Sequence, residues 1–250
     1  MKKVILVFSL VVLLSSCSSD SSDSNSNQLV KEIRSTTGTS SLVFKYFYNG
    51  NKITSVQAGD YWVNQYEYEG NLIVSFFNVV NGDINVEVHY EYDNQNRLIK
   101  ETATEYQEGA SDLRTYAYNA DNTITRLSYN GLTASPSNLY STSKIYLDAT
   151  GKFFKIQDLI ASNWITTLEV TYTDINSPLK NIIGFDKIIF LSDTVISFDT
   201  YTSYNQNGSL YSSSTFDYTI NSSNYPTQRT QSYTNANGDI TVSNYEFIYY

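Results

Sequence analysis

A short unit recurs along this chain: an extended segment with tyrosines two residues apart, a turn, and a second β-prone segment. The clearest copy is Val88–Lys100, in which Tyr90 and Tyr92 precede the turn Asp93-Asn94-Gln95-Asn96. Residues two apart point to the same face of a strand. Asp and Asn side chains bond to the nearby backbone in turns. Each copy therefore predicts a β-hairpin.

Further copies are found around Tyr48, Tyr68, Tyr118, Leu147 and Tyr172. With Tyr92 included, successive copies lie 20, 24, 26, 29 and 25 residues apart. Asn49-Gly50 follows the first copy, and Asn-Gly is a strong hairpin signal. With two-residue loops, Tyr46 is expected to oppose Ile53, and Tyr66 to oppose Ile73. A period near 25, with two strands per unit, indicates a repeat architecture.

The later part of the chain is less regular. The strand that ends at Tyr172 is predicted to turn at residues 173–176 and to return after Ser177-Pro178, because proline suits the first position of a strand. Residues 181–191 are the most apolar stretch outside the N-terminus. Such a run indicates either a strand buried on both faces or a short buried helix.

These units predict an all-β chain of about fifteen strands in one long antiparallel meander of tyrosine-rich hairpins. Because open twisted sheets rarely exceed ~10 strands without curling, we expect a curved open sheet or a partly closed barrel. A two-layer β-sandwich is the alternative. Residues 29–250 are expected to form a single β-repeat domain.

The N-terminus has the pattern of an export signal. Lys2 and Lys3 precede the apolar run Val4–Leu14, which is too short to span a bilayer as a helix but suits a signal-peptide core. The ending Leu14-Ser15-Ser16-Cys17 resembles the bacterial lipobox, which implies cleavage between Ser16 and Cys17 and lipid modification of Cys17. Residues 1–16 are therefore predicted to be a lipoprotein signal peptide. An ordinary secretory signal with an incidental cysteine is the alternative.

Residues 17–28 are rich in Ser, Asp and Asn. They have little apolar surface to bury, so we predict a disordered tether. Their composition resembles the export signal of surface lipoproteins in Bacteroidota, with a plain spacer as the alternative. The chain is thus expected to be attached to the outer membrane by its lipid, on either the periplasmic or the cell-surface face.

The unit Tyr-x-Tyr-Asp, turn, Arg-Leu, best seen in Tyr90–Leu98, resembles the YD repeats of RHS-type envelope proteins. With the lipobox, the tether and the segment Ser177–Phe185, the chain resembles uncharacterised flavobacterial (Bacteroidota) lipoproteins. This resemblance implies an envelope location and brings no activity with it. The units differ in length from YD repeats, so a closed RHS cocoon is not implied.

Charge and residue types exclude several function classes. The net charge is −9, and loss of Lys2 and Lys3 makes it −11, so nucleic acid is not an expected partner. The sole histidine, His89, shares a strand face with Glu87 and Glu91, and we expect it to be solvated. A Ser-His-Asp triad would have to use this histidine, and a zinc site needs several His or Cys ligands. No catalytic residue, metal site or cofactor is predicted.

Carboxylates and aromatics remain as candidates. Two carboxylates suffice for glycoside hydrolysis, but turn formation explains the aspartates in turns, Asp93, Asp121, Asp148 and Asp174. The tyrosine rows are interpreted as structural, since aromatic cross-strand pairs contribute ~0.2–1 kcal/mol each. Trp62 and Trp164, expected in loops between units, are the candidate ligand-binding aromatics.

We therefore predict a non-catalytic cell-envelope lipoprotein that binds or scaffolds a glycan, a peptide or a partner protein. A carboxylate-based polysaccharide hydrolase and a carrier whose curved sheet cradles an acyl chain are the alternatives. An integral outer-membrane barrel also uses alternating strands and can end on an aromatic residue such as Tyr250. It is disfavoured because the Tyr-Glu-Tyr pattern gives no continuous lipid-facing band.

Overall fold

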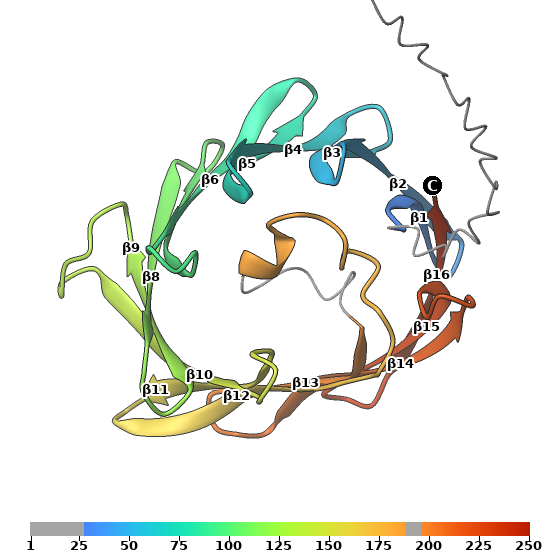
Figure 1. The fold of residues 1–250 in the computed structure, drawn as a ribbon. Coiled ribbons are helices and arrows are strands. Elements are labelled where there is room, and N and C mark those ends of the chain that lie inside the picture. Colours follow the sequence, from blue (N-terminus) through green and yellow to red (C-terminus); the bar gives the residue numbers. More distant parts are fainter. Residues whose placement is uncertain (1–27, 189–196) are drawn as a thin grey trace, which may run out of the picture.

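The computed structural model describes residues 28–188 and 197–250, and within them the strands form one closed antiparallel barrel (Figure 1). The sixteen strands are β1 (Val30–Thr37), β2 (Ser40–Asn49), β3 (Lys52–Ala58), β4 (Trp62–Glu69), β5 (Leu72–Val80), β6 (Asp83–Tyr92), β7 (Leu98–Glu105), β8 (Ala110–Tyr118), β9 (Thr123–Asn130), β10 (Leu139–Leu147), β11 (Phe153–Ile160), β12 (Asn163–Tyr172), β13 (Phe198–Tyr204), β14 (Leu210–Ile220), β15 (Pro226–Asn235) and β16 (Ile240–Tyr249). Each strand pairs with its neighbours in sequence, and β1 pairs with β16. The predicted all-β antiparallel meander is confirmed, and its two edges meet to close a barrel.

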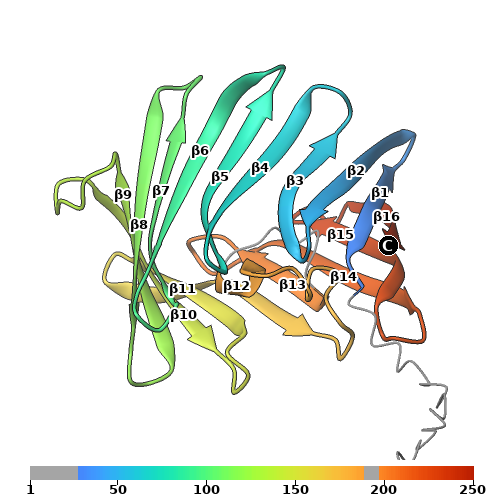
Figure 2. The ribbon, with the colours of Figure 1, turned by 45° about the horizontal axis from the view of Figure 1, so that its top comes forward.

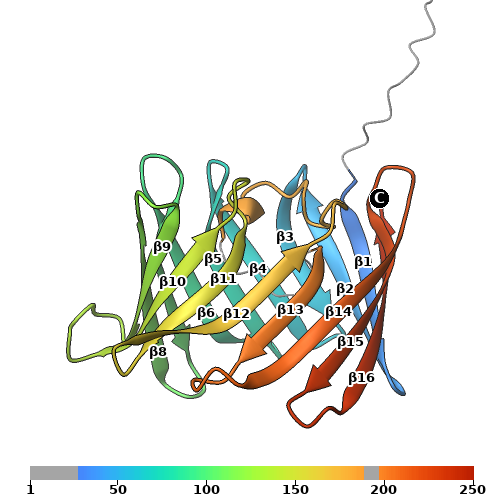
Figure 3. The ribbon, with the colours of Figure 1, turned by 90° about the horizontal axis from the view of Figure 1, so that it is seen from below.

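The two ends of the barrel differ. Even-numbered strands finish, and odd-numbered strands begin, at the end that also carries the first described residues (Figure 3). Seven even-numbered strands have a tyrosine near this end, and we call these residues the tyrosine rim: Tyr48, Tyr68, Tyr92, Tyr118, Tyr172, Tyr218 and Tyr249. We call this end of the barrel the tyrosine end.

The hairpin register differs from the expected one. The loop Gly50-Asn51 closes the hairpin on Asn49 and Lys52, which places Tyr48, rather than Tyr46, opposite Ile53. A register shift directly before Tyr48 then pairs Tyr46 with Val56. The second hairpin behaves in the same way, with Tyr68 opposite Ile73. Shifts of this kind are β-bulges, which add a residue to one strand and turn the strand locally.

The connection between β12 and β13 is also not the one predicted. No strand follows Ser177-Pro178 in the described residues up to 188, and β13 begins at Phe198. Residues 173–188, which we call the plug, lie inside the barrel at the tyrosine end (Figures 1 and 2). A short 3-10 helix, η1 (Phe185–Lys187), agrees with the buried-helix alternative for this stretch. The end of the expected apolar run, residues 189–191, lies outside the described residues.

The plug fixes the apolar core of this end. Four plug side chains pack against wall residues from both sides of the β1–β16 closure: Leu179, Ile182, Phe185 and Ile188 join Val30, Ile33, Tyr46, Ile53, Ile73 and Phe247. The ring of Phe185 lies 5.7 Å from that of Tyr66. These contacts identify the inward face of the wall. In the described residues, no helix is long and apolar enough to cross a bilayer.

The outward face of the wall carries polar and charged side chains, together with exposed apolar ones such as Phe47, Leu159 and Trp164. Side chains alternate along a strand, so residues between the core positions point away from the plug, among them Glu32, Arg34, Lys45, Glu67, His89, Glu91, Lys100, Lys144, Lys155 and Glu169. Outward ion pairs join Arg34 to Glu246 at 3.1 Å and Lys100 to Glu91 at 2.7 Å. A membrane-spanning barrel has an apolar outer band, and these outward charges interrupt any such band.

Candidate functional site

The rim tyrosines brace each hairpin against the next. Their hydroxyls donate to inward-lying backbone carbonyls: Tyr48 to Val30 (2.7 Å), Tyr92 to Ile73 (2.7 Å), Tyr118 to Leu98 (3.1 Å), Tyr172 to Phe153 (2.7 Å), Tyr218 to Phe198 (2.8 Å) and Tyr249 to Pro226 (2.8 Å). In four of these bonds, the acceptor residue is the cross-strand partner of the preceding rim tyrosine around the barrel. The bonds therefore run from hairpin to hairpin around the barrel.

Tyr68 is the rim tyrosine whose hydroxyl donates to the plug. Its hydroxyl accepts from the Ile53 N–H at 3.2 Å and donates to the Ile183 carbonyl of the plug at 3.0 Å. Burial raises the pKa of Tyr68 and of Tyr218 to about 12, so these hydroxyls stay protonated and can donate at any physiological pH. The contacts agree with the structural interpretation of the tyrosines.

The rim has one gap, at Leu147 on β10. Leu147 pairs with Phe153 directly after a register shift. The pairings of Tyr48, Tyr68, Tyr92 and Tyr172 also follow shifts, in which the extra residue lies in the partner strand. Leu147 therefore occupies a rim position without a hydroxyl. The carbonyl that a tyrosine would reach there, by the pattern of its neighbours, belongs to Ile124, which pairs with Tyr118.

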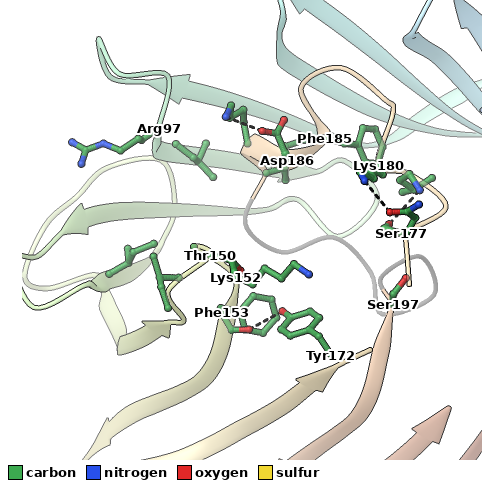
Figure 4. Close-up of a pocket in the computed structure, with 18 of the residues that line it drawn as sticks. Arg97, Thr150, Lys152, Phe153, Tyr172, Ser177, Lys180, Phe185, Asp186 and Ser197 are labelled. Atoms are coloured by element: carbon green, nitrogen blue, oxygen red, sulfur yellow. Dashed lines mark hydrogen bonds and ion pairs between the residues drawn. The ribbon is translucent and has the colours of Figure 1, made fainter. Parts of the chain in front are cut away.

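A cavity of about 800 Å³ lies beside this gap, between the plug and the wall from β7 to β13 (Figure 4). Its apolar lining comes from the wall and includes Leu98, Ile124, Leu147, Phe153 and Tyr172. Leu98 and Ile124 are only 1% and 2% exposed. Both side chains are therefore closely packed by their neighbours, and we call this apolar lining the floor of the cavity.

The charged side chains that line the cavity include more cations than anions. Arg97, Lys152, Lys180 and Lys187 line it, against the carboxylates Asp174 and Asp186. This excess stands out in a chain whose net charge is −9. The cations come from two sides: Arg97 and Lys152 come from turns of the wall, and Lys180 and Lys187 come from the plug. The Arg97 side chain points away from the plug (Figure 4).

The four cations are held differently. Carboxylates engage two of them, with Arg97 Nη2 2.6 Å from Asp93 and Lys187 Nζ 2.7 Å from Asp186. Lys180 Nζ donates to the amide oxygen of Asn176 at 2.8 Å. The fourth, Lys152, lies over the ring of Tyr172, 4.9 Å from its centroid.

Comparisons with known proteins bear on the fold. No family model matches the chain, and no curated protein does. A porin-like protein from Bacteroides vulgatus superposes with a TM-score of 0.56 at 16% identity, over 89% of this chain and 99% of that one. A porin-like protein from Bacteroides uniformis gives 0.51 at 13% identity, over 88% and 96%. The fold is that of a porin-like barrel. The YD-repeat resemblance gains no support from these matches.

The predicted ligand-binding tryptophans lie apart within this barrel. Both belong to strands, β4 and β12, so the expectation that they lie in loops is wrong. Trp62 packs in the interior, with its ring 6.0 Å from that of Phe44. Trp164 faces outward with Lys144 5.5 Å from its ring. The lipidation residues, Ser16 and Cys17, lie outside the described residues.

The turn aspartates act as predicted. Asp93 Oδ1 accepts from the backbone N–H groups of Gln95 and Arg97, both at 2.9 Å. Asp148 accepts in the same way from Thr150 and Lys152. The side-chain hydrogen bond from Arg97 is the main cause that lowers the pKa of Asp93. Asp174 differs from the other turn aspartates, because it lines the cavity.

The remaining polar candidates are tied to neighbours. His89 faces outward as predicted, 2.7 Å from Glu87 and 3.1 Å from the Ser75 hydroxyl. Inside the barrel, Arg114 binds Glu101 at 2.5 Å, and the Ser143 hydroxyl donates to Asp158 at 2.6 Å. The cavity cations were missed from the sequence. The available signal was the leucine at position 147, where the repeat otherwise places tyrosine.

Proposed function

We propose that this chain is a non-catalytic binding module of the cell envelope, a barrel that stands in water and encloses a ligand chamber. The observation that carries this proposal is the set of charged side chains on the outward face. A lysine or arginine on the lipid face of a barrel costs ~2–4 kcal/mol at the bilayer midplane. Here Arg34, Lys45, Lys100, Lys144 and Lys155 all face outward from strands.

The position of the plug inside the barrel supports a chamber rather than a conduit. The plug is joined to the wall through Tyr68, as described above, and through the Ile183 N–H, which donates to the Asn51 carbonyl at 3.0 Å. Its apolar side chains are packed in the core of the tyrosine end. The ligand is a glycan, a peptide, a partner protein or a small molecule that enters the cavity.

Attachment to the outer membrane is assigned to lipid on Cys17. Two or three acyl chains would anchor the protein stably, since each buried methylene adds ~0.8 kcal/mol. Mass spectrometry of the native N-terminus tests this assignment. We expect an acylated Cys17 as the first residue, and an unmodified Cys17 or cleavage elsewhere would contradict the anchor.

A second experiment tests the water-exposed barrel independently. The full chain carrying Cys17→Ala cannot be acylated at that position, so we expect 4 M urea to extract it from membranes and detergent-free buffer to keep it in solution. A Cys17→Ala chain that leaves the membrane only with detergent would show a lipid-embedded barrel and overturn the proposal.

A pore is the second candidate, because both similar solved structures are described as porin-like. Planar-bilayer recording separates the two functions. We expect the purified protein to give no stable conductance steps, since charged side chains face outward from its strands and the plug occupies part of its interior. Reproducible steps would favour the pore over the chamber.

A further inference from the structure

We propose that the cavity at the tyrosine end binds a long-chain carboxylate, with the apolar tail against β7–β11 and the anionic head between Lys152 and Lys180. This inference rests on the proposed function as a binding module and names its ligand class. It follows from three observations: the gap in the tyrosine rim, the apolar floor, and the placement of the cations.

The gap creates the space for the tail. At each neighbouring rim position a tyrosine ring fills the inside of the wall and its hydroxyl occupies a backbone carbonyl. Leu147 is shorter and supplies only methyl groups. Leu147, Ile124 and Phe153 all line the cavity, so the cavity adjoins the position that a tyrosine ring would extend from. A single departure from the repeat has therefore opened the wall lining to a ligand.

The floor selects an apolar ligand part. Leu98, Ile124, Leu147 and Phe153 offer no hydrogen-bonding groups on their side chains, and three of them are less than 10% exposed. A sugar hydroxyl against such a surface would lose its bonds to water without replacement, which is unfavourable. A hydrocarbon chain gains from the same burial. The volume lies in the range of sites that enclose small molecules.

The two lysines select an anionic head. Arg97 and Lys187 are already paired with carboxylates. Lys180 is held by an amide oxygen and Lys152 by an aromatic face. Neither contact partner is charged, and the carboxylate that interacts electrostatically with Lys152 is the turn residue Asp148. Lys152 stands on the wall and Lys180 on the plug (Figure 4), so one carboxylate between them would bridge the two.

Calorimetric titration of the full Cys17→Ala chain tests the proposal with four probes below their micelle concentrations. Laurate carries both features, dodecanol lacks the charge, dodecyltrimethylammonium reverses it, and acetate lacks the tail. We expect laurate to bind at one site, dodecanol at least tenfold more weakly, and the other two not at all. Equal binding of laurate and dodecanol would overturn the anionic part, and binding of acetate the apolar part.

Two variants locate the site. Lys152→Gln should weaken laurate binding at least fivefold, because it removes one charge from an exposed turn and leaves the floor intact. Leu147→Tyr should abolish binding by filling the gap, with its hydroxyl directed to the Ile124 carbonyl. Lys100→Gln, on the outward face, is the matched control and should bind laurate like the parent chain.

The outcomes separate this inference from the proposed function. A chain that needs no detergent, gives no conductance and yet binds no laurate would overturn the ligand class and leave the chamber in place. Laurate binding that survives both Lys152→Gln and a folded Leu147→Tyr would overturn the site. If Leu147→Tyr fails to fold, an unchanged affinity in Lys152→Gln is sufficient to do so.

Discussion

At the residue scale, the side chains that define this barrel are tyrosines used for their hydroxyls as much as for their rings. A strand end normally leaves an inward carbonyl to water or to a turn. Here the next hairpin supplies a phenol. Burial raises the pKa of Tyr48, Tyr92 and Tyr172 well above the usual range, so each remains a neutral donor. The repeated tyrosines in the sequence correspond to these hydrogen bonds between neighbouring hairpins.

Removing one hydroxyl should therefore have a measurable cost. Tyr92→Phe keeps the ring and deletes the bond to the Ile73 carbonyl, whose residue is fully buried. We expect the free energy of unfolding to fall by about 0.5–1.5 kcal/mol, the usual net worth of such a bond. Urea unfolding measures it. Tyr211→Phe, at an exposed position, is the control and should change stability by less than about 0.5 kcal/mol.

A pH dependence follows from the turn at Asp93. The side-chain bond from Arg97 Nε, at 2.8 Å, leads the interactions that lower the pKa of Asp93 in the folded chain. A carboxyl whose folded pKa is depressed stabilises the fold above its unfolded pKa of about 3.9, and this contribution is lost as the pH falls through the folded pKa. The stability advantage of the parent over Asp93→Asn should shrink as the pH is lowered from 6 to 2.5. An advantage that does not change with pH would contradict the assignment.

At the element scale, the hairpins could be predicted from the sequence and the plug could not. Turn chemistry at Asn49-Gly50 or Asp93 is local, so a few residues determine it. The register depends on bulges before the rim tyrosines, which no local pattern announced. The plug was interpreted as a return strand because Ser177-Pro178 is a valid strand start. Its true position depends on an apolar barrel interior that exists only after closure.

The same reasoning applies to the site. Leu147 occupies a position where the other repeats have tyrosine. The sequence shows this difference, but its consequence follows only once the tyrosines are seen to bond neighbouring hairpins around the barrel. The cations of the cavity are separated in sequence, with Arg97 and Lys152 in different turns and Lys180 in the plug. Only the curvature of the wall brings them to one cavity. Trp62 and Trp164 looked equivalent in the sequence, and the wall separates them onto opposite faces.

Gly184 tests how tightly the plug is seated. Its φ is +82°, and a Cβ there would lie 2.8 Å from the Asn71 carbonyl oxygen and 3.3 Å from the Ile73 nitrogen. Gly184→Ala adds a clash with the wall to the backbone strain, so we expect a stability loss of about 2–4 kcal/mol. Hydrogen exchange should show faster exchange in residues 179–188.

Gly208→Ala is the matched control for this change. Its φ is +80°, and a Cβ there meets nothing within 4 Å, so it reports the backbone strain alone, about 1 kcal/mol. Equal losses in the two variants would mean that the plug is not seated against β5 as described.

At the scale of the whole molecule, apolar groups fill the tyrosine end of the barrel around the plug, and closure makes this arrangement possible. Charged side chains lie on the outward face, and polar contacts such as Arg114–Glu101 lie farther along the interior. An open sheet of this length would expose two edges. Joining β1 to β16 removes both edges and creates an interior for the plug. The sequence indicated alternation on every strand, but alternation alone does not say which face is inside. The plug contacts decide that question.

This polarity predicts opposite responses to substitution on the two faces. Ile53 is fully buried beside the plug, so Ile53→Ala should lower the free energy of unfolding by about 2–5 kcal/mol. Lys100 faces outward in an exposed pair with Glu91, and such pairs contribute about 0–1 kcal/mol. Lys100→Leu should therefore leave stability in detergent-free buffer within about 1 kcal/mol of the parent. In a lipid-embedded wall, Lys100→Leu would instead stabilise the protein in bilayers and make it insoluble in buffer. Urea unfolding of both variants, in buffer and in the presence of phospholipid vesicles, distinguishes the two arrangements, and a vesicle-dependent gain for Lys100→Leu would refute the water-exposed barrel.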